Sequence, residues 1–219
     1  MKIAVSGASG KTGYRIAEEA IKEGHSVTLI TRENSIIPSS LKECTRLITS
    51  FLDLNNLTKC LTGIDTLIIA TGARPSPDLT GPLMVDALGV KNQVECCRKI
   101  GLKRVILVSS LCSGKLLHPL NFFGLILMCK RIGEKSLESS GLDWTIVRPG
   151  GLNEEEDSEL EGIKYTGKNK QFDGSISRRL VAKCCVESIE EQLAINKIIE
   201  ITSSKSQNKV LLSEALKEV

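Results

Sequence analysis

Three glycines near the start of the chain, Gly7, Gly10 and Gly13, have the spacing of a turn that binds phosphate groups. They follow the expected strand Lys2–Ser6 with its apolar run Ile3-Ala4-Val5, and apolar residues at helical spacing follow them. The first glycine permits a tight turn, the second lets the backbone approach a pyrophosphate, and the third lets a helix pack closely on a strand. With a further expected strand over Ser26–Arg32, the pattern predicts the opening unit of a dinucleotide-binding sheet, with phosphates at the N terminus of the helix.

Two other interpretations of this turn fit the residues less well. Gly10-Lys11-Thr12 matches the end of an ATP-binding loop, G-x-x-x-x-G-K-[ST], but that loop needs a glycine where the chain has Val5. The next apolar strand, Thr66–Ala70, also lacks a terminal aspartate that could bind magnesium. A purely structural turn is the other alternative, and the strand and helix around the glycines make it the weaker one.

Strand and helix patterns alternate along the whole chain. The expected strands are Lys2–Ser6, Ser26–Arg32, Arg46–Phe51, Thr66–Ala70, Arg104–Ser109, Trp144–Arg148 and Lys197–Thr202. The expected helices are Thr12–Glu23, Leu54–Leu61, Pro82–Ile100, Phe122–Ser140 and Ser177–Glu191. The strand runs are continuously apolar, as in parallel strands buried on both faces. The alternation predicts a single-domain α/β Rossmann fold over residues 1–219, with a doubly wound parallel sheet of about seven strands.

The stretch Gly150–Gly174 is irregular and long for a compact domain, so we expect it to form a loop region on the substrate side. It contains the acidic run Glu154-Glu155-Glu156-Asp157. Without spaced ligands, this run is interpreted as a solvated loop face rather than a metal site, and no metal is expected.

The composition excludes several classes of protein. Of 219 residues, 41% are hydrophobic and 25% are charged, which are ordinary globular values. A net charge of +3 and 3% aromatic residues argue against a nucleic-acid partner. The 8 cysteines include no C-x-x-C pair, so they are interpreted as buried reduced thiols rather than zinc ligands or disulfides. Reduced thiols predict a reducing, cytoplasmic compartment.

No integral membrane segment is expected. The apolar stretch Leu116–Cys129 is interrupted by His118, Pro119 and Asn121, and a span needs about 20 apolar residues. This stretch is expected to cover a substrate pocket, to touch a membrane surface or to form a core-facing helix. The chain begins one residue before an expected strand, which leaves no room for a leader peptide. No long amphipathic helix is left over, so a monomer or weak homodimer is expected.

The end of the second strand distinguishes NAD from NADP. An acidic residue there binds the ribose 2′-hydroxyl, whereas an arginine accommodates a 2′-phosphate. The chain places Arg32 at this point and has no carboxylate before Glu33. Arg32 therefore favours NADP, against the alternative of an ordinary surface arginine.

The carboxyl ends of the third and fourth strands complete the expected cofactor edge. Asp53 and Leu54 are placed to flank an adenine, although Asp53 could equally be a helix N-cap. Ala70, Thr71 and Gly72 are small enough to let the backbone pass close to a pyrophosphate and a ribose.

These segments resemble the atypical branch of the short-chain dehydrogenase/reductase family, and more narrowly the NmrA-like NAD(P)-binding group that includes biliverdin reductase B, a flavin reductase. The resemblance covers nearly the whole chain. Its matching segments are GASGKTG at 7–13, Arg32, Asp53-Leu54, GVKNQVECCRKIGLKRVILVSS at 89–110, ESSGLDWTIVRPGGL at 138–152 and SISRRLVAKCCVESI at 175–189.

The resemblance implies a role for each matching position. The phosphates would be cradled by Gly7, Ser9, Gly10, Lys11, Thr12 and Gly13. Arg32 would hold the 2′-phosphate, Asp53 and Leu54 the adenine, and Ala70, Thr71 and Gly72 the central ribose and pyrophosphate. The nicotinamide would be bordered by Ser109 and Ser110 and walled by Pro149, Gly150, Gly151 and Leu152, with Arg74 near the cofactor or substrate.

One departure from the family changes the expected chemistry. Short-chain dehydrogenases generally use Tyr-x-x-x-Lys, in which the lysine lowers the pKa of a tyrosine that exchanges a proton with a carbonyl oxygen. Lys130 matches the lysine, but Ile126 stands at the tyrosine position, and neither Tyr14 nor Tyr165 has the required spacing. Lys130 could bind the nicotinamide ribose or extend to solvent from a packed face. Ser110 could orient the acceptor or cap the end of a strand.

The expected function is therefore hydride transfer that needs no strong protein acid. The resemblance implies an NADP-dependent reductase of a planar acceptor such as a flavin or a quinone-like or tetrapyrrole compound, with Ser110 and Lys130 as the catalytic candidates. The alternative is a regulator or scaffold that binds NADP without turnover.

Overall fold

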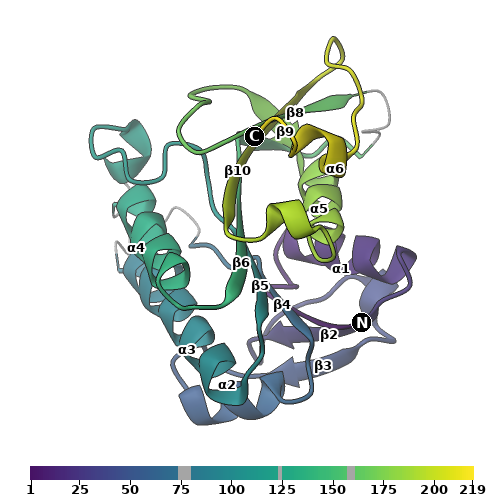
Figure 1. The fold of residues 1–219 in the computed structure, drawn as a ribbon. Coiled ribbons are helices and arrows are strands. Elements are labelled where there is room, and N and C mark those ends of the chain that lie inside the picture. Colours follow the sequence, from purple (N-terminus) through teal and green to yellow (C-terminus); the bar gives the residue numbers. More distant parts are fainter. Residues whose placement is uncertain (74–79, 123–124, 157–160) are drawn as a thin grey trace.

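The computed structural model describes residues 1–73, 80–122, 125–156 and 161–219, which form a central sheet with helices on both faces (Figure 1). The strands of this sheet are β1 (Lys2–Ser6), β2 (Ser26–Thr31), β3 (Thr45–Ile48), β4 (Thr66–Ile69), β5 (Arg104–Val108), β6 (Asp143–Pro149), β8 (Gly162–Thr166) and β10 (Lys197–Ser204). Their spatial order is β3-β2-β1-β4-β5-β6-β10-β8. The predicted doubly wound Rossmann fold is thereby confirmed.

Every predicted strand forms, and these strands all pair in parallel. The sheet has 8 strands rather than about seven, because β8 adds an antiparallel edge strand beside β10. A separate small sheet pairs β7 (Gly151–Asn153) with β9 (Ser175–Ser177). The expectation that Gly150–Gly174 is irregular throughout is wrong, because both β7 and β8 lie within it. With three and five residues, the strands β7 and β8 are too short to show a clear alternation of apolar and polar residues in the sequence.

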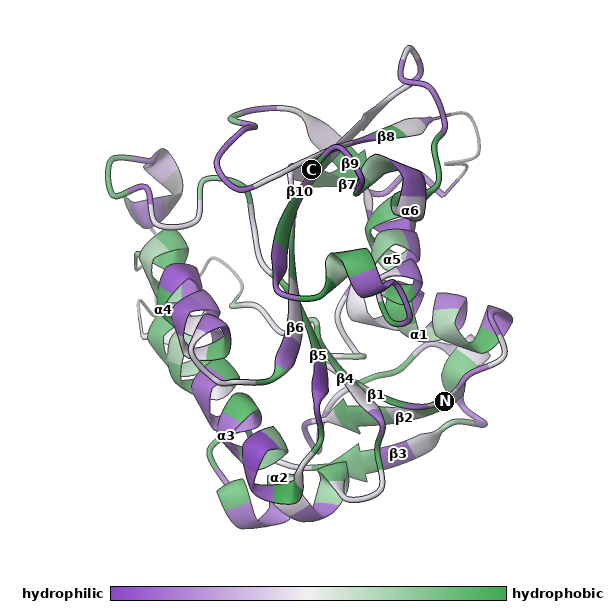
Figure 2. Ribbon diagram, in the orientation of Figure 1, coloured by the Kyte–Doolittle hydropathy of each residue, from purple (hydrophilic) through white to green (hydrophobic). Residues whose placement is uncertain are grey.

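The helices cover the two faces of the sheet (Figure 1). On one face lie α1 (Gly13–Lys22), α5 (Arg178–Glu187) and the short α6 (Leu212–Ala215), and on the other lie α2 (Leu54–Leu61), α3 (Val90–Ile100) and α4 (Ile126–Glu138). Each face has its own apolar core. The central strands consist largely of hydrophobic residues, whereas each helix has both hydrophobic and hydrophilic residues (Figure 2).

Two helices begin or end differently from the expectation. The segment expected as one helix from Pro82 consists of a π-helical turn, η2 (Leu83–Gly89), followed by α3. The helix expected from Phe122 begins at Ile126, because Leu125 has a left-handed backbone with a φ of 55° and a short 3-10 turn precedes it at Pro119–Phe122. The expected helix over Ser177–Glu191 stops at Glu187, and two further 3-10 turns occupy Ser39–Leu41 and Gln192–Ala194.

The cysteines behave as small apolar residues. All eight are free, and only Cys44 is not buried. Burial raises the pKa of Cys97 and of Cys184 to about 12, so both thiols stay protonated and unreactive near neutral pH. Among the described helices, none has both the length and the apolar character to cross a bilayer.

The turn after β1 depends on two glycines. Gly7 has a φ of 81°, and a Cβ atom built on it would lie 2.8 Å from the carbonyl oxygen of Ala70. A Cβ atom on Gly13 would lie 2.2 Å from the carbonyl oxygen of Gly7. The N terminus of α1 can therefore rest directly on the turn only because residue 13 has no side chain.

We predict that Gly13→Ala destabilises the fold by about 2 kcal/mol or more, because a backbone oxygen cannot yield to the added methyl group as a flexible side chain would. The measurement is the free energy of urea unfolding. Gly167→Ala is the matched control, since its Cβ would meet only Val219 at an ordinary 3.8 Å. Equal stabilities of the two variants would contradict the packing argument.

Candidate functional site

The glycine turn, the end of β2 and the end of β4 meet at the carboxyl edge of the sheet. The Gly7 amide donates to the carbonyl oxygen of Ile30 at 3.2 Å, and the position of a Gly7 Cβ lies 2.9 Å from the Thr71 nitrogen. The predicted phosphate turn and the predicted ribose and pyrophosphate residues Ala70, Thr71 and Gly72 are thus adjacent. This is the crevice in which open α/β sheets bind ligands.

Two polar features at this edge fit a bound dinucleotide. No side chain within the described part of the chain caps the N terminus of α1, where Thr12 is the N-cap residue. The Thr71 side chain is 8% exposed, and its hydroxyl has no hydrogen-bond partner among the described residues. The Tyr14 amide donates to the Gly10 carbonyl oxygen at 3.0 Å, so a backbone contact holds the helix start. A helix N terminus without a side-chain cap suits phosphate oxygens, and a buried orphan hydroxyl suits a ligand oxygen.

Arg32 lies at the end of β2 with its side chain exposed to solvent. A second arginine, Arg46 on β3, holds the loop that follows: its guanidinium donates to the carbonyl oxygens of Arg32 and Ser35 at 3.1 and 2.9 Å. Arg46 also donates to the Thr31 hydroxyl at 2.8 Å. These contacts of Arg46 fix the backbone that carries the Arg32 side chain. The sequence did not indicate this role of Arg46.

Asp53 acts as the N-cap of α2. Its carboxylate accepts a hydrogen bond from the Asn56 amide at 3.0 Å, and Leu54 begins the helix. The helix-cap interpretation of Asp53 therefore has direct structural support, and a role of Asp53 and Leu54 beside an adenine stays a prediction.

A small cavity at the ends of β4 and β5 brings three predicted site residues together. Thr71, Ser109 and Lys130 line it, together with the unpredicted Asp86 of η2. The cavity holds about 10 Å³, roughly the volume of one water molecule.

Lys130 is neither a solvent-directed lysine nor a free one. Its ammonium pairs with the Asp86 carboxylate at 2.8 Å, and their side chains are 16% and 2% exposed. The second carboxylate oxygen of Asp86 accepts from the Ala73 amide at 3.0 Å. The pair therefore fixes both the lysine and the loop after β4. Removing Asp86 would leave a largely buried ammonium unpaired.

Ser109 connects the cavity to a buried ionic network. Its hydroxyl donates to the Glu134 carboxylate at 2.6 Å, and Arg148 donates to both oxygens of the same carboxylate at 2.8 and 2.7 Å. Arg131 donates to it at 2.9 Å. Burial alone would raise the pKa of Glu134, but the hydrogen bonds and charge of Arg148, with the bonds from Ser109 and Arg131, hold it below the ordinary value.

The network continues through Arg148 to the loop beyond β8. Arg148 contacts Glu200 at 3.2 Å and the Asn169 side chain at 2.9 Å. Glu200 accepts from the amides of Asn169, Lys170 and Gln171, each at 2.8 Å. Side chains that are 1% or less exposed (Glu134, Arg148 and Glu200) thus link Ser109, just after β5, to the loop over 169–171.

The end of β6 lies beside Ser109, and the role of Pro149–Leu152 as a wall of the nicotinamide stays a prediction. The Ser109 amide donates to Val147, and the Leu111 amide donates to Pro149 at 2.9 Å. Gly150 is required by its surroundings, since a Cβ there would lie 2.5 Å from the carbonyl oxygen of Gly174. Gly151 begins β7, and Leu152 is 39% exposed.

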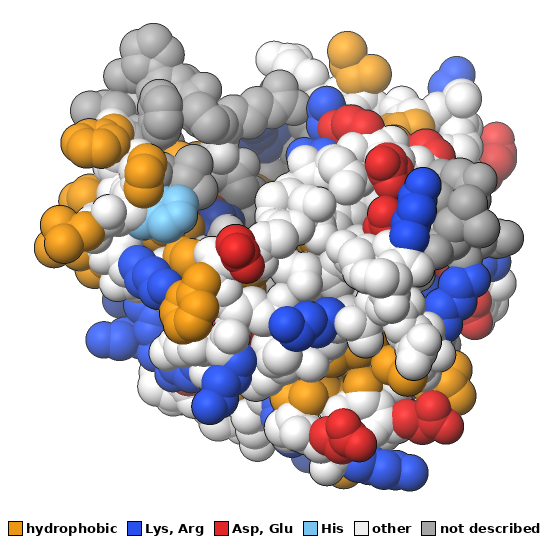
Figure 3. Space-filling view, turned by 90° about the horizontal axis from the view of Figure 1, so that it is seen from above, with side chains coloured by type: hydrophobic (Ala, Val, Ile, Leu, Met, Phe, Trp, Pro, Cys, Tyr) orange, Lys and Arg blue, Asp and Glu red, His pale blue; other side chains and the backbone are white. Residues whose placement is uncertain are grey.

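Ser110 is half-buried, and exposed apolar side chains occur in the segment between Leu116 and Leu125 and at Phe172. We call them the apolar rim: Leu116, Leu117, Phe122, Leu125 and Phe172. Lys115 lies over the Phe172 ring at 3.9 Å and joins the two parts of the rim. The β5–α4 part stands at the left of the space-filling view (Figure 3). Arg74 lies outside the described residues.

A larger cavity lies elsewhere. It has a volume of about 790 Å³ between α1, α5 and β8, and most of its lining side chains are charged. Tyr165 faces it, and burial raises the pKa of this phenol well above its ordinary range. Tyr14 lies under the guanidinium of Arg15. Neither tyrosine lines the small cavity with Lys130 and Ser109.

A family model described as NAD(P)H-binding matches residues 7–192. The chain belongs to this NAD(P)H-binding family. The match confirms the predicted resemblance to atypical short-chain dehydrogenases/reductases and the prediction of a nicotinamide-dinucleotide site, without distinguishing NAD from NADP.

Individual relatives and solved structures are also similar to this chain over most of its length. The chain is 35% identical over 216 residues to an uncharacterised chloroplastic protein of Arabidopsis thaliana, covering 92% of this chain and 76% of that one. It is 30% identical over 193 residues to sanguinarine reductase of Eschscholzia californica, covering 69% of each. A structure of a putative NAD-dependent epimerase/dehydratase from Bacillus halodurans superimposes with a TM-score of 0.86, 25% identity and full coverage of both chains.

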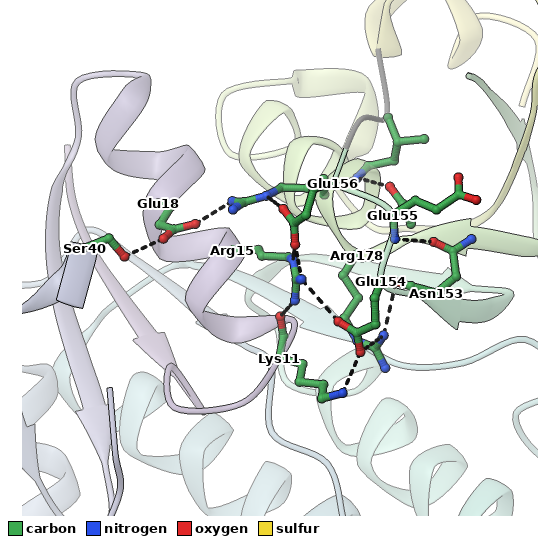
Figure 4. Close-up of polar contacts among 12 residues, drawn as sticks. Lys11, Arg15, Glu18, Ser40, Asn153, Glu154, Glu155, Glu156 and Arg178 are labelled. Carbon is green, nitrogen blue, oxygen red and sulfur yellow. Dashed lines mark hydrogen bonds and ion pairs between the residues drawn. The ribbon is translucent and has the colours of Figure 1, made fainter. Parts of the chain in front are cut away.

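The charged residues of this NAD(P)H-binding chain were the hardest to predict. Asp86 is a carboxylate within a largely apolar helical pattern, a signal that it needs a buried partner, whereas Glu134 lies among charged residues and gives no such signal. Glu154 and Glu156 are exposed, as expected for a solvated loop face, but their carboxylates also pair with cations of the glycine turn, α1 and α5, which the sequence did not indicate (Figure 4).

We predict that Glu134→Gln lowers the free energy of unfolding near neutral pH by about 3 kcal/mol, because it removes one partner of a buried pair. The folded-state pKa of Glu134 lies below its ordinary 4.5, so its contribution is complete above that value and is lost as pH falls through the folded-state pKa. The deficit of the variant should shrink in acid.

Urea unfolding between pH 7 and pH 3 measures both effects. Glu95→Gln removes an exposed pair with Arg98 and should cost less than about 1 kcal/mol at every pH. A Glu134→Gln deficit that equals this control, or that grows in acid, would contradict the prediction.

Proposed function

We propose that this protein is an NADP-dependent reductase that transfers hydride from NADPH to a planar acceptor such as a flavin or a quinone-like or tetrapyrrole compound. The observation that carries the proposal is the cavity at the carboxyl edge, where Lys130, Ser109 and the orphan hydroxyl of Thr71 meet. A sanguinarine reductase that is 30% identical over 69% of the chain supports a reductase.

The chain's own residues would hold and orient the coenzyme. The amides of the turn from Ser9 to Gly13 would bind the phosphates, and Arg32 would bind the 2′-phosphate. Lys130, fixed by Asp86, would donate to the nicotinamide ribose. The bound coenzyme supplies the hydride. Ser110 would orient the acceptor, while Ser109 is already committed to Glu134.

The missing tyrosine limits which acceptors can react. Ile126 is 7% exposed at the first residue of α4, one turn before Lys130, so this position offers no proton donor. A ketone needs a proton on its oxygen as hydride arrives, whereas an extended conjugated acceptor can take its proton from solvent. The apolar rim offers exposed Leu and Phe side chains on which a flat, apolar molecule could lie.

The second candidate is a protein that binds NADP as a signal without turnover. Ile126 favours it as well, since the position of the usual acid is apolar. Both candidate functions need the coenzyme site, and they differ in whether the bound NADPH transfers hydride to an acceptor.

We predict measurable steady-state oxidation of NADPH with flavin mononucleotide as acceptor, followed at the absorbance of reduced nicotinamide. Tight NADPH binding without turnover, across flavin and quinone acceptors, would support the binding-only protein instead. If calorimetry detected no binding of either NADPH or NADH, both candidate functions would be ruled out.

We predict that Arg32→Ala weakens NADPH binding by roughly tenfold or more and leaves NADH binding within about twofold, because only NADPH carries the 2′-phosphate. Calorimetric dissociation constants for both coenzymes make the comparison. Lys42→Ala, an exposed cation elsewhere in the chain, is the control. Equal losses for both coenzymes would remove the assignment of Arg32.

A further inference from the structure

The loop after β7 forms an ionic connection with the phosphate turn (Figure 4). One oxygen of Glu154 lies 2.7 Å from the Lys11 ammonium and 2.8 Å from Arg178 at the start of α5. Its other oxygen lies 3.2 Å from Arg15 of α1. Three cations from two helices and the turn therefore converge on one carboxylate.

Glu156 makes a second set of contacts two residues later. Its carboxylate accepts from Arg15 at 2.8 Å and also pairs with Arg179, which in turn pairs with Glu18 of α1. The Arg15 side chain is only 5% exposed and also donates to the Lys11 carbonyl oxygen at 2.7 Å. Arg15 therefore holds the backbone of the turn and the acidic loop at once.

We call Glu154 and Glu156, with these cation partners, the acidic clasp. It joins two parts of the chain that are 143 residues apart at Lys11 and Glu154. One part is the turn proposed to bind the phosphates. The other part follows Pro149–Leu152, proposed to wall the nicotinamide, because β7 leads straight into the clasp. The clasp thus ties together the two sides of the proposed coenzyme site.

The clasp leaves Lys11 able to bind a phosphate. An ammonium has three N–H donors, and Glu154 uses one of them. A free lysine side chain loses considerable rotamer freedom when it is fixed on a ligand, whereas one already held by a carboxylate loses less. The four cations Lys11, Arg15, Arg178 and Arg179 face three carboxylates, Glu18, Glu154 and Glu156, so one positive charge is left over for an anion.

We propose that Glu154 and Glu156 are positioning residues for the coenzyme: they hold Lys11 and the phosphate turn against the β7 loop and so slow coenzyme release. The proposal rests on the coenzyme site proposed above. It assigns to the acidic loop an effect on the dissociation rate, because a Lys11 side chain held in place by Glu154 would separate from a bound phosphate more slowly than a freely moving one.

Stopped-flow measurement of NADPH binding, followed by its fluorescence, tests this assignment. We expect Glu154→Gln to raise the dissociation rate constant roughly three- to tenfold, and Glu154→Gln/Glu156→Gln to raise it further. The association rate constant should change less than about twofold, because electrostatic attraction of the anionic coenzyme is not weakened by losing a carboxylate. The difference between wild type and variant should shrink at 0.5 M salt, where exposed ion pairs are screened.

Glu155→Gln is the matched control. It removes the same charge from the same loop, and the Glu155 side chain forms no ion pair with any described residue. It should leave both rate constants within about twofold of wild type. Thermal denaturation of each apo variant checks the fold, and Glu154→Gln alone keeps Arg15 and Arg179 paired with Glu156 if the double variant is unstable.

Two results would overturn the proposal. A dissociation rate constant that is unchanged, or equal to that of Glu155→Gln, would show that the clasp does not retain the coenzyme. Tighter binding by Glu154→Gln would show that Glu154 competes with phosphate for Lys11. Failure of the wild-type protein to bind either nicotinamide coenzyme is a different result, because it removes the proposed function itself.

Discussion

The contact between Gly13 and the carbonyl oxygen of Gly7 is the constraint on which the rest of the molecule depends. It lets α1 begin directly on the turn after β1, so the N-terminal amides of the helix lie at the carboxyl edge of the sheet. The same placement lays α1 along α5. Lys11 and Arg15 then lie close to Arg178 and the acidic loop, and Thr71 lies next to the turn. A side chain at position 13 would disturb all of these contacts together.

The arrangement of the sheet could be predicted because its signals are local. Continuous apolar runs, and glycines such as Gly24, Gly101 and Gly141 that end helical patterns, fix where strands and helices alternate. Alternation with right-handed crossovers then fixes a doubly wound sheet. The missed elements lack such signals: β7 has three residues, β8 is a short edge strand, and nothing in Leu83–Gly89 separates a π-helical turn from an α-helical one.

The candidate site was predictable only in part. Glycines, Arg32 and Lys130 can be placed by their distance from an expected strand or helix. Charge pairs cannot be placed in this way, because the two partners lie far apart in the sequence and meet only in the folded chain. Lys130 and Asp86 are 44 residues apart, and Arg15 and Glu156 are 141 residues apart. A carboxylate such as Glu154 looks the same in sequence whether it faces water or three cations. The cost of an unpaired buried charge explains why such partners exist without telling which residues they are.

The Asp86–Lys130 pair has a consequence for how variants of this chain are understood. Asp86 holds the Ala73 amide with one oxygen and Lys130 with the other, so the strand-end loop and helix α4 share one anchor. Replacing Lys130 with a neutral residue would leave the buried Asp86 carboxylate without its ammonium partner. The loop with Gly72 and Ala73, which Asp86 also holds, would then change its conformation. Lost activity in such a variant would therefore combine an altered loop with a missing ammonium. Exchanging both members of the pair for neutral residues of similar size separates the two contributions.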